Sequence, residues 1–107
     1  MTDSVFVYVT TPNEDMARKI GRTAVDRKQA ACANIFPQME SIYSWKGQIC
    51  EEKESVLILK TCKELVTPLK ETVLALHEYE CPCLVVLPIE DGHEAFLQWI
   101  KAQTVRA

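Results

Sequence analysis

The chain lacks the features that mark several large classes of protein. None of its apolar runs approaches the roughly 20 residues that cross a bilayer, and no secretory signal opens it, so we expect no membrane partner. It carries no glycine-rich phosphate loop, no Gly-x-Ser-x-Gly and no His-Glu-x-x-His motif, and we therefore predict that it is not an enzyme. A formal net charge of −3 and a pI near 5.4 provide no concentrated basic face, so we expect no nucleic-acid partner.

The usual cysteine frameworks are missing as well. No two cysteines have the Cys-x-x-Cys spacing, which excludes a zinc ribbon and a thioredoxin-type redox pair. The count of five is odd, and with no secretory signal we expect reduced thiols in a cytoplasmic protein. Cys50 and Cys62 are expected to be structural. The full set is Cys32, Cys50, Cys62, Cys81 and Cys83.

The most informative segment present is 30–61, which has the pattern of two long β-strands around a tight turn at 45–48. Strands in small domains usually have about five or six residues, so arms of this length would extend beyond the core of their own domain. Pro37 indicates a bulge or an edge position within the first arm. The apolar side chains at the far end need a cover from another chain, and the hairpin therefore predicts assembly. These side chains are Ile42, Tyr43, Trp45 and Ile49.

The segment before the hairpin predicts one strand and one helix. A run of β-branched and aromatic residues predicts a buried strand over 5–9. Apolar residues at helical spacing predict a helix over 13–29, capped at its start by either Thr11 or Asn13.

The segment after the hairpin predicts a second helix, a last strand and a short terminal helix. The second helix should begin around 63–65 and end near His77, and 84–89 reads as a buried strand. Residues 91–94 have the spacing of a capping box before the terminal helix. The order β-α-β-β-α-β-α predicts an α+β fold of the ferredoxin-like type, with a long central hairpin and a C-terminal helix, as a single domain over 1–107.

Four sequence blocks, together with their order along nearly the whole chain, resemble the CutA family of divalent-cation-tolerance proteins. The blocks are Ala30–Pro37, Ser41–Gly47, Ile58–Thr61 and Leu87–Ile89, the last followed by Gly92 and Leu97–Trp99. The resemblance implies a ferredoxin-like fold, a tight homotrimer similar in architecture to the PII signalling proteins, and an association with copper and other divalent metals.

One segment departs from the family pattern. The family usually has His-Pro-Tyr, then a proline and often a glutamate, before the last strand, whereas this chain reads HEYECPC over 77–83. His77 and Tyr79 match the pattern, and Glu78 and Cys83 do not. The departure leaves the implied fold and trimer untouched and bears only on ligand geometry carried over to this segment.

The candidate metal ligands are His77, Cys32, Cys81 and Cys83. Imidazole and thiolate suit copper, and the resemblance implies metal binding in the segment that contains His77. Two alternatives stay open. Cys32 has the character of a small apolar filler in a core or interface, and His77 has that of a helix-end residue favoured by the helix dipole.

Other candidate residues belong to clefts and interfaces. Lys60 follows a buried run and should emerge at the sheet end, where it meets an anion or lies as a surface lysine over apolar neighbours. Lys60 and Tyr79 are candidate ligand contacts in a cleft between subunits. Tyr43, Trp45 and Trp99 are interpreted as interface aromatics rather than as a cofactor site.

The leading functional hypothesis is a cytoplasmic homotrimer of the CutA type that binds divalent or soft metal ions, copper foremost, and is linked to metal tolerance. The alternative is a PII-like small-molecule sensor or protein-interaction adaptor that uses clefts between subunits and has a partner protein still to be identified. An RNA-binding role is disfavoured, because the aromatic strand motifs of RNA-binding sheets are missing and the chain is acidic.

Overall fold

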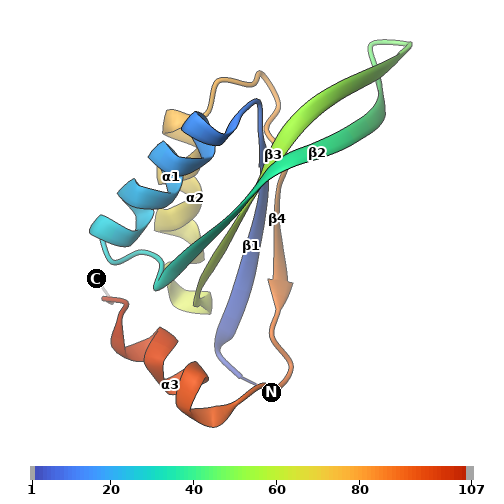
Figure 1. Ribbon diagram of the computed structural model, residues 1–107. Coiled ribbons are helices and arrows are strands. Elements are labelled where there is room, and N and C mark those ends of the chain that lie inside the picture. Colours follow the sequence, from blue (N-terminus) through green and yellow to red (C-terminus); the bar gives the residue numbers. More distant parts are fainter. Residues whose placement is uncertain (1, 106–107) are drawn as a thin grey trace.

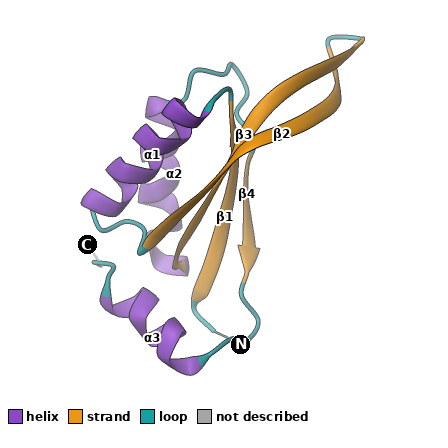
Figure 2. Cartoon of the chain, viewed as in Figure 1, coloured by secondary structure: helices purple, strands orange, loops and turns teal. Residues whose placement is uncertain are grey.

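The computed structural model describes residues 2–105, which form four strands and three α-helices (Figures 1 and 2). The order β-α-β-β-α-β-α confirms the predicted ferredoxin-like α+β fold. The elements are β1 (Ser4–Thr11), α1 (Glu14–Asp26), β2 (Cys32–Trp45), β3 (Gln48–Cys62), a 3-10 turn (Lys63–Leu65), α2 (Val66–Leu76), β4 (Leu84–Pro88) and α3 (Glu94–Ala102).

The strands form one antiparallel sheet in the order β2-β3-β1-β4. Helices α1 and α2 cover one face of it, and α3 lies beyond the sheet end opposite the hairpin tip (Figure 1). Because side chains alternate along a strand, β1 directs Val5, Val7 and Val9 into the helical layer, where all three are buried. The core between the sheet and the two helices is completed by Ile20, Leu57, Leu59, Leu69 and Val73, among others.

Helix α1 approaches the sheet closely at Gly21. A Cβ atom there would lie 3.0 Å from the Cβ of Ala33 and 3.3 Å from Cδ1 of Leu57. Glycine therefore permits the short distance between the helix and strands β2 and β3.

The β2–β3 hairpin is as long as the sequence predicts and extends well past the other strands (Figure 2). Lys46 and Gly47 both have positive φ, at 50° and 79°, which is the conformation of a two-residue turn matched to strand twist. Near the tip, Ile42 and Ile49 are 71% and 72% exposed in the single chain. The hairpin gives the molecule an elongated shape of 44 × 25 × 21 Å.

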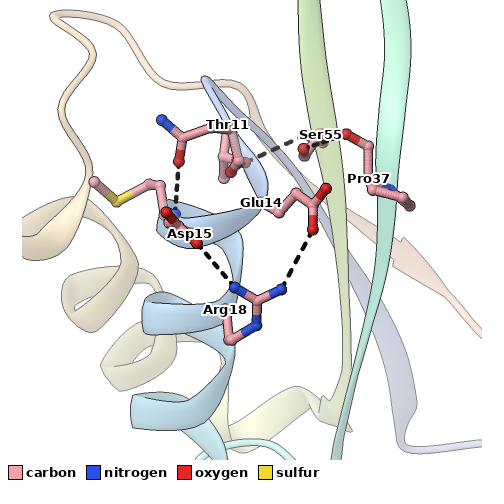
Figure 3. Close-up of polar contacts among 8 residues, drawn as sticks. Thr11, Glu14, Asp15, Arg18, Pro37 and Ser55 are labelled. Atoms are coloured by element: carbon pink, nitrogen blue, oxygen red, sulfur yellow. Dashed lines mark hydrogen bonds and ion pairs between the residues drawn. The ribbon is translucent and has the colours of Figure 1, made fainter.

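Pro37 lies at a bulge in an edge strand, as predicted. The β2–β3 register shifts between Phe36 and Met39, so Pro37 occupies the irregular stretch where it has no ladder bond to donate. The hydroxyl of Ser55 donates to the carbonyl oxygen of Pro37 at 2.7 Å, and the hydroxyl of Thr11 donates to the carbonyl of Ser55 at 3.4 Å (Figure 3).

Helix α1 is shorter than the predicted 13–29. It ends at Asp26, because Lys28 takes a left-handed φ of 58° and the amides of Gln29 and Ala30 both return to the carbonyl of Ala24. Asn13 is its N-cap, with Oδ1 accepting from the amide of Met16 at 2.8 Å. In the first turn, Arg18 pairs with Glu14 and Asp15 (Figure 3).

The predicted capping box before α3 is wrong. His93 is the N-cap and its side chain forms no capping hydrogen bond with the described residues, whereas the carboxylate of Asp91 accepts from the amide of Gly92 at 2.8 Å. Because the Asp91 carboxylate is bonded to the amide of the next residue, it does not cap the helix. Helix α3 is instead held by Ile100, which is fully buried against Ala31 and Cys62.

Candidate functional site

A hollow of about 550 Å³ lies along one face of the hairpin, from its turn to its base, between β2, β3 and the segment 79–83. It forms because alternate residues of each arm share one face of the hairpin: 41, 43 and 45 on β2, and 50, 52 and 54 on β3. The lining residues are Thr10, Ser41, Tyr43, Trp45, Cys50, Glu52, Glu54, Tyr79, Glu80, Cys81 and Cys83.

Two phenol–carboxylate pairs lie in this hollow. Tyr79 donates its hydroxyl to Oε2 of Glu54 at 2.7 Å, and Glu54 is only 8% exposed. Tyr43 donates its hydroxyl to Oε1 of Glu52. This bond to Glu52 is the main reason that the pKa of Tyr43 is raised to about 12, whereas burial and then the bond to Glu54 raise the pKa of Tyr79 well above its ordinary value. The hollow is therefore a place of negative potential that opposes phenolate formation.

His77 supports the segment that closes the hollow. Its Nδ1 accepts from the amide of Tyr79 at 3.1 Å, so the proton resides on Nε2, which donates to the carbonyl oxygen of Thr10 at 2.7 Å. The two rings lie 4.7 Å apart between centroids. His77 therefore fixes Tyr79 against the end of β1, and a metal ion at either ring nitrogen would displace one of these hydrogen bonds.

Cys81 and Cys83 are exposed and line the hollow together with Cys50. Cys50, which was expected to be structural, lines the same hollow as these two candidate ligands. The sequence analysis did not identify it as a lining residue, nor did it identify Glu52, Glu54 and Glu80. A signal for the β3 residues was present, since 50, 52 and 54 alternate along a predicted strand and must share a face.

Cys32, Lys60 and Trp99 lie elsewhere. Cys32 and Lys60 are direct cross-strand partners on β2 and β3, and the Lys60 ammonium lies 5.5 Å and 5.4 Å from the ring centroids of Phe6 and Phe96. Cys32 and Trp99 line a second groove, of about 520 Å³, beside α1. Within one chain the structure therefore separates Lys60 from Tyr79, and Cys32 from the other three candidate ligands.

In the single chain, the candidate ligands do not form a complete metal site. Among residues 2–105, no group of three or more histidine, cysteine, aspartate or glutamate side chains is close enough to hold an ion. The donor chemistry of the hollow is nevertheless suitable, since two exposed thiols of Cys81 and Cys83 border it. Within the same described range, no helix has both the length and the apolar character needed to cross a membrane.

Comparison with known proteins relates the whole arrangement to one family. The chain is 44% identical to the chloroplastic protein CutA of Arabidopsis thaliana over 94% of its own length and 56% of that protein's. It is 42% identical to the divalent-cation tolerance protein CutA of Thermus thermophilus over 92% of its own length and 95% of that protein's. A crystal structure of CutA1 from Oryza sativa superimposes with a TM-score of 0.94 at 39% identity, covering 99% of this chain and 97% of that one.

The chain thus spans little more than half the length of several curated relatives, although it covers nearly all of the bacterial one. The family model for the CutA1 divalent ion tolerance protein matches residues 5–103. With the hairpin, the sheet order and these matches in agreement, the chain belongs to the CutA1 divalent ion tolerance family.

Proposed function

We propose that this protein is a cytoplasmic homotrimer that binds copper, or another divalent or soft metal ion, and that this binding underlies a role in divalent-ion tolerance. The observation that supports metal binding is the placement of Cys81 and Cys83, two exposed thiols at the edge of the acidic hollow. Thiolates favour Cu(I), and a pair of them satisfies its low coordination number. All five cysteines are thiols, which suits a reducing compartment.

The proposed trimer is supported by surfaces that a single chain leaves uncovered. On the sheet face opposite α1 and α2, Phe36 is 56% exposed, Val85 49% and Leu87 46%. The tips of the hairpins carry exposed Tyr43 and Trp45. A second and third copy would cover both surfaces and also the edges of β2 and β4.

In this proposal the candidate residues have different roles. Cys81 and Cys83 bind the ion, and His77 acts as a positioning residue, because both of its ring nitrogens are engaged and it fixes the start of the same segment. Cys32 would join the site only if a neighbouring subunit brings it there. No residue of the hollow is assigned a catalytic role.

The test is a titration of the assembled, reduced protein with Cu(I) against a competing chelator. Replacing both Cys81 and Cys83 by serine should abolish tight binding, whereas Cys32→Ser should leave it unchanged. His77→Ala should weaken binding by about tenfold without dissociating the trimer. Binding should also weaken as the pH falls, because thiolate ligands must lose protons. If the double serine variant retains the parent affinity, the ion is bound elsewhere.

A second candidate function is a small-molecule sensor or adaptor of the PII type, with a partner protein still to be identified. The volume and aromatic walls of the hollow favour it, as such clefts are typical of small-molecule sites. Lys60 lies outside the hollow, near the rings of Phe6 and Phe96, and would be the contact for an anionic group in a cleft that a neighbouring subunit completes. Loss of metabolite binding in Lys60→Ala, with copper binding intact, would support this function over the first.

A further inference from the structure

The segment 77–83 carries the two thiols of the proposed copper site, and both of its ends are held by the backbone of one residue. The carbonyl oxygen of Thr10, near the end of β1, accepts a hydrogen bond from Nε2 of His77 at 2.7 Å. The amide of the same residue donates to the carbonyl oxygen of Cys83 at 3.3 Å. The two ends of the segment are therefore fixed to one point of the sheet, and the part between them depends on other contacts.

The middle of the segment is attached to the sheet by Tyr79. Its hydroxyl donates to Oε2 of Glu54 at 2.7 Å, and Glu54 lies on β3, where it is paired with Met39 and only 8% exposed. The next residue, Glu80, pairs with Lys46, but their side chains are 74% and 70% exposed, so that pair is screened by water and weak. The bond between Tyr79 and Glu54 is therefore the stronger of the two attachments.

Burial makes this bond both strong and persistent. A hydrogen bond to a charged acceptor that water barely reaches contributes more to stability than a bond between neutral, exposed groups. Burial of Tyr79 and its bond to Glu54 also raise the pKa of this phenol, so the hydroxyl keeps its proton and continues to donate throughout the neutral range. The phenol in turn offsets part of the free energy that is needed to bury the carboxylate.

We propose that Glu54 is a positioning residue, which fixes the segment carrying Cys81 and Cys83 through the hydroxyl of Tyr79. This inference rests on the copper function proposed above and extends it to a side chain that does not itself contact the ion. A segment that is already fixed in the free protein loses less conformational freedom when its thiolates bind, and the affinity is higher for that reason. Side chains that hold metal ligands in place typically contribute about ten- to a hundredfold to the affinity.

Strand β3 supplies a matched control two residues away. Glu52 lies on the same face and accepts a hydrogen bond from Tyr43, so it has the same residue type and the same kind of partner. Its phenol comes from β2 rather than from the segment 77–83. Replacing Glu52 therefore removes a charge and a hydrogen bond without releasing the thiols.

The first measurement needs no metal. In the assembled, reduced protein, hydrogen exchange of the Tyr79 amide reports the order of the segment, since this amide donates to Nδ1 of His77. Glu54→Ala and Tyr79→Phe should each speed its exchange by about tenfold, because each removes the same buried bond. Glu54→Gln retains an acceptor oxygen and should restore most of the protection, and Glu52→Ala should leave the exchange unchanged.

The second measurement is the titration with Cu(I) against a competing chelator. Glu54→Ala and Tyr79→Phe should each weaken binding by about tenfold, whereas Glu54→Gln and Glu52→Ala should stay close to the parent. Because the first two variants act through one bond, a variant with both substitutions should bind no more weakly than either single one. Light scattering should give every variant the mass of the parent assembly.

Three results would overturn the inference. The first is unchanged exchange of the Tyr79 amide in both Glu54→Ala and Tyr79→Phe, which would mean that the ends alone fix the segment. The second is parent-like copper affinity in Glu54→Ala, and the third is an equal loss of affinity in Glu52→Ala, which would reduce the effect to charge.

The variant with serine at both 81 and 83 separates this inference from the copper proposal. If that variant retains the parent affinity, the copper proposal fails, and the exchange of the Tyr79 amide still decides whether Glu54 fixes the segment.

Discussion

At the residue scale, Tyr79 connects parts of the chain that are far apart in sequence. Its hydroxyl reaches Glu54 on β3, and its amide reaches His77, which in turn holds the carbonyl of Thr10 at the end of β1. The segment after α2 has no regular secondary structure, and these side-chain contacts attach it to β1 and β3. These contacts give His77 and Tyr79 a structural role that needs no metal ion.

The tyrosines of the hollow lead to a prediction on pH dependence. The pKa of Tyr43 is raised from 10.0 to about 12, mainly by its bond to Glu52. Because the folded state favours the protonated phenol, this contribution to stability is present below pH 10.0 and is lost as the pH rises through about 12. Absorbance titration of the phenolate should show Tyr43 ionising late, and Glu52→Gln should return it towards 10.0.

The control for this titration is Tyr43→Phe, which should remove the late-ionising group. If Tyr43→Phe instead removes a group that titrates near 10.0 in the folded parent, the hydrogen bond to Glu52 does not govern this phenol.

At the element scale, the structure identifies the side chain that caps the start of α1. Both Thr11 and Asn13 have a spacing suited to capping, and sequence alone left them as alternatives. The hydroxyl of Thr11 is engaged instead with the carbonyls of Asn13 and Ser55, which leaves Asn13 to accept from Met16. The choice between the two caps therefore depends on a contact between Thr11 and β3 that is distant in sequence.

Removal of the α1 cap should destabilise the fold measurably. Asn13→Ala is expected to lower the free energy of unfolding by about 1 kcal/mol, because the amide of Met16 loses its partner. Asn13→Asp retains the acceptor and should stay close to the parent. Both are measured by denaturant unfolding, and an Asn13→Ala variant as stable as Asn13→Asp would contradict the assignment.

The helices and strands also show which parts of the fold could be predicted from the sequence. Local sequence patterns predicted the α-helices, the strands and the long hairpin, and the missing amide of Pro37 predicted the bulge. The expected burial of the strand at 84–89 was wrong for the single chain, in which β4 is mostly exposed. Local patterns did not predict the end of α1 or the loss of the capping box at Asp91, which depend on single backbone turns. The hollow was missed as a unit since its residues come from three segments, although the alternation of 50, 52 and 54 was visible.

At the scale of the whole molecule, the two faces of the sheet differ. The face under α1 and α2 is closed, with Val7, Val9 and Leu59 fully buried. The opposite face carries Phe36 and Val85 in the open. An exposed apolar face of this kind together with two uncovered strand edges is typical of a subunit interface.

The proposed homotrimer is tested by introducing a charge on that open face. Val85 is the β4 partner of Tyr8 and lies on the open face, 49% exposed. Val85→Glu should dissociate the trimer, because rotational symmetry would bury three carboxylates without counter-ions near one axis. Leu74→Glu is the matched control, since Leu74 is 46% exposed on α2, in the helical layer that the proposed trimer would leave in water. Light scattering at micromolar concentration should give three chain masses for the parent and Leu74→Glu and a smaller mass for Val85→Glu. A parent of one chain mass would refute the trimer, and a Val85→Glu variant that stays trimeric would place the interface away from this face.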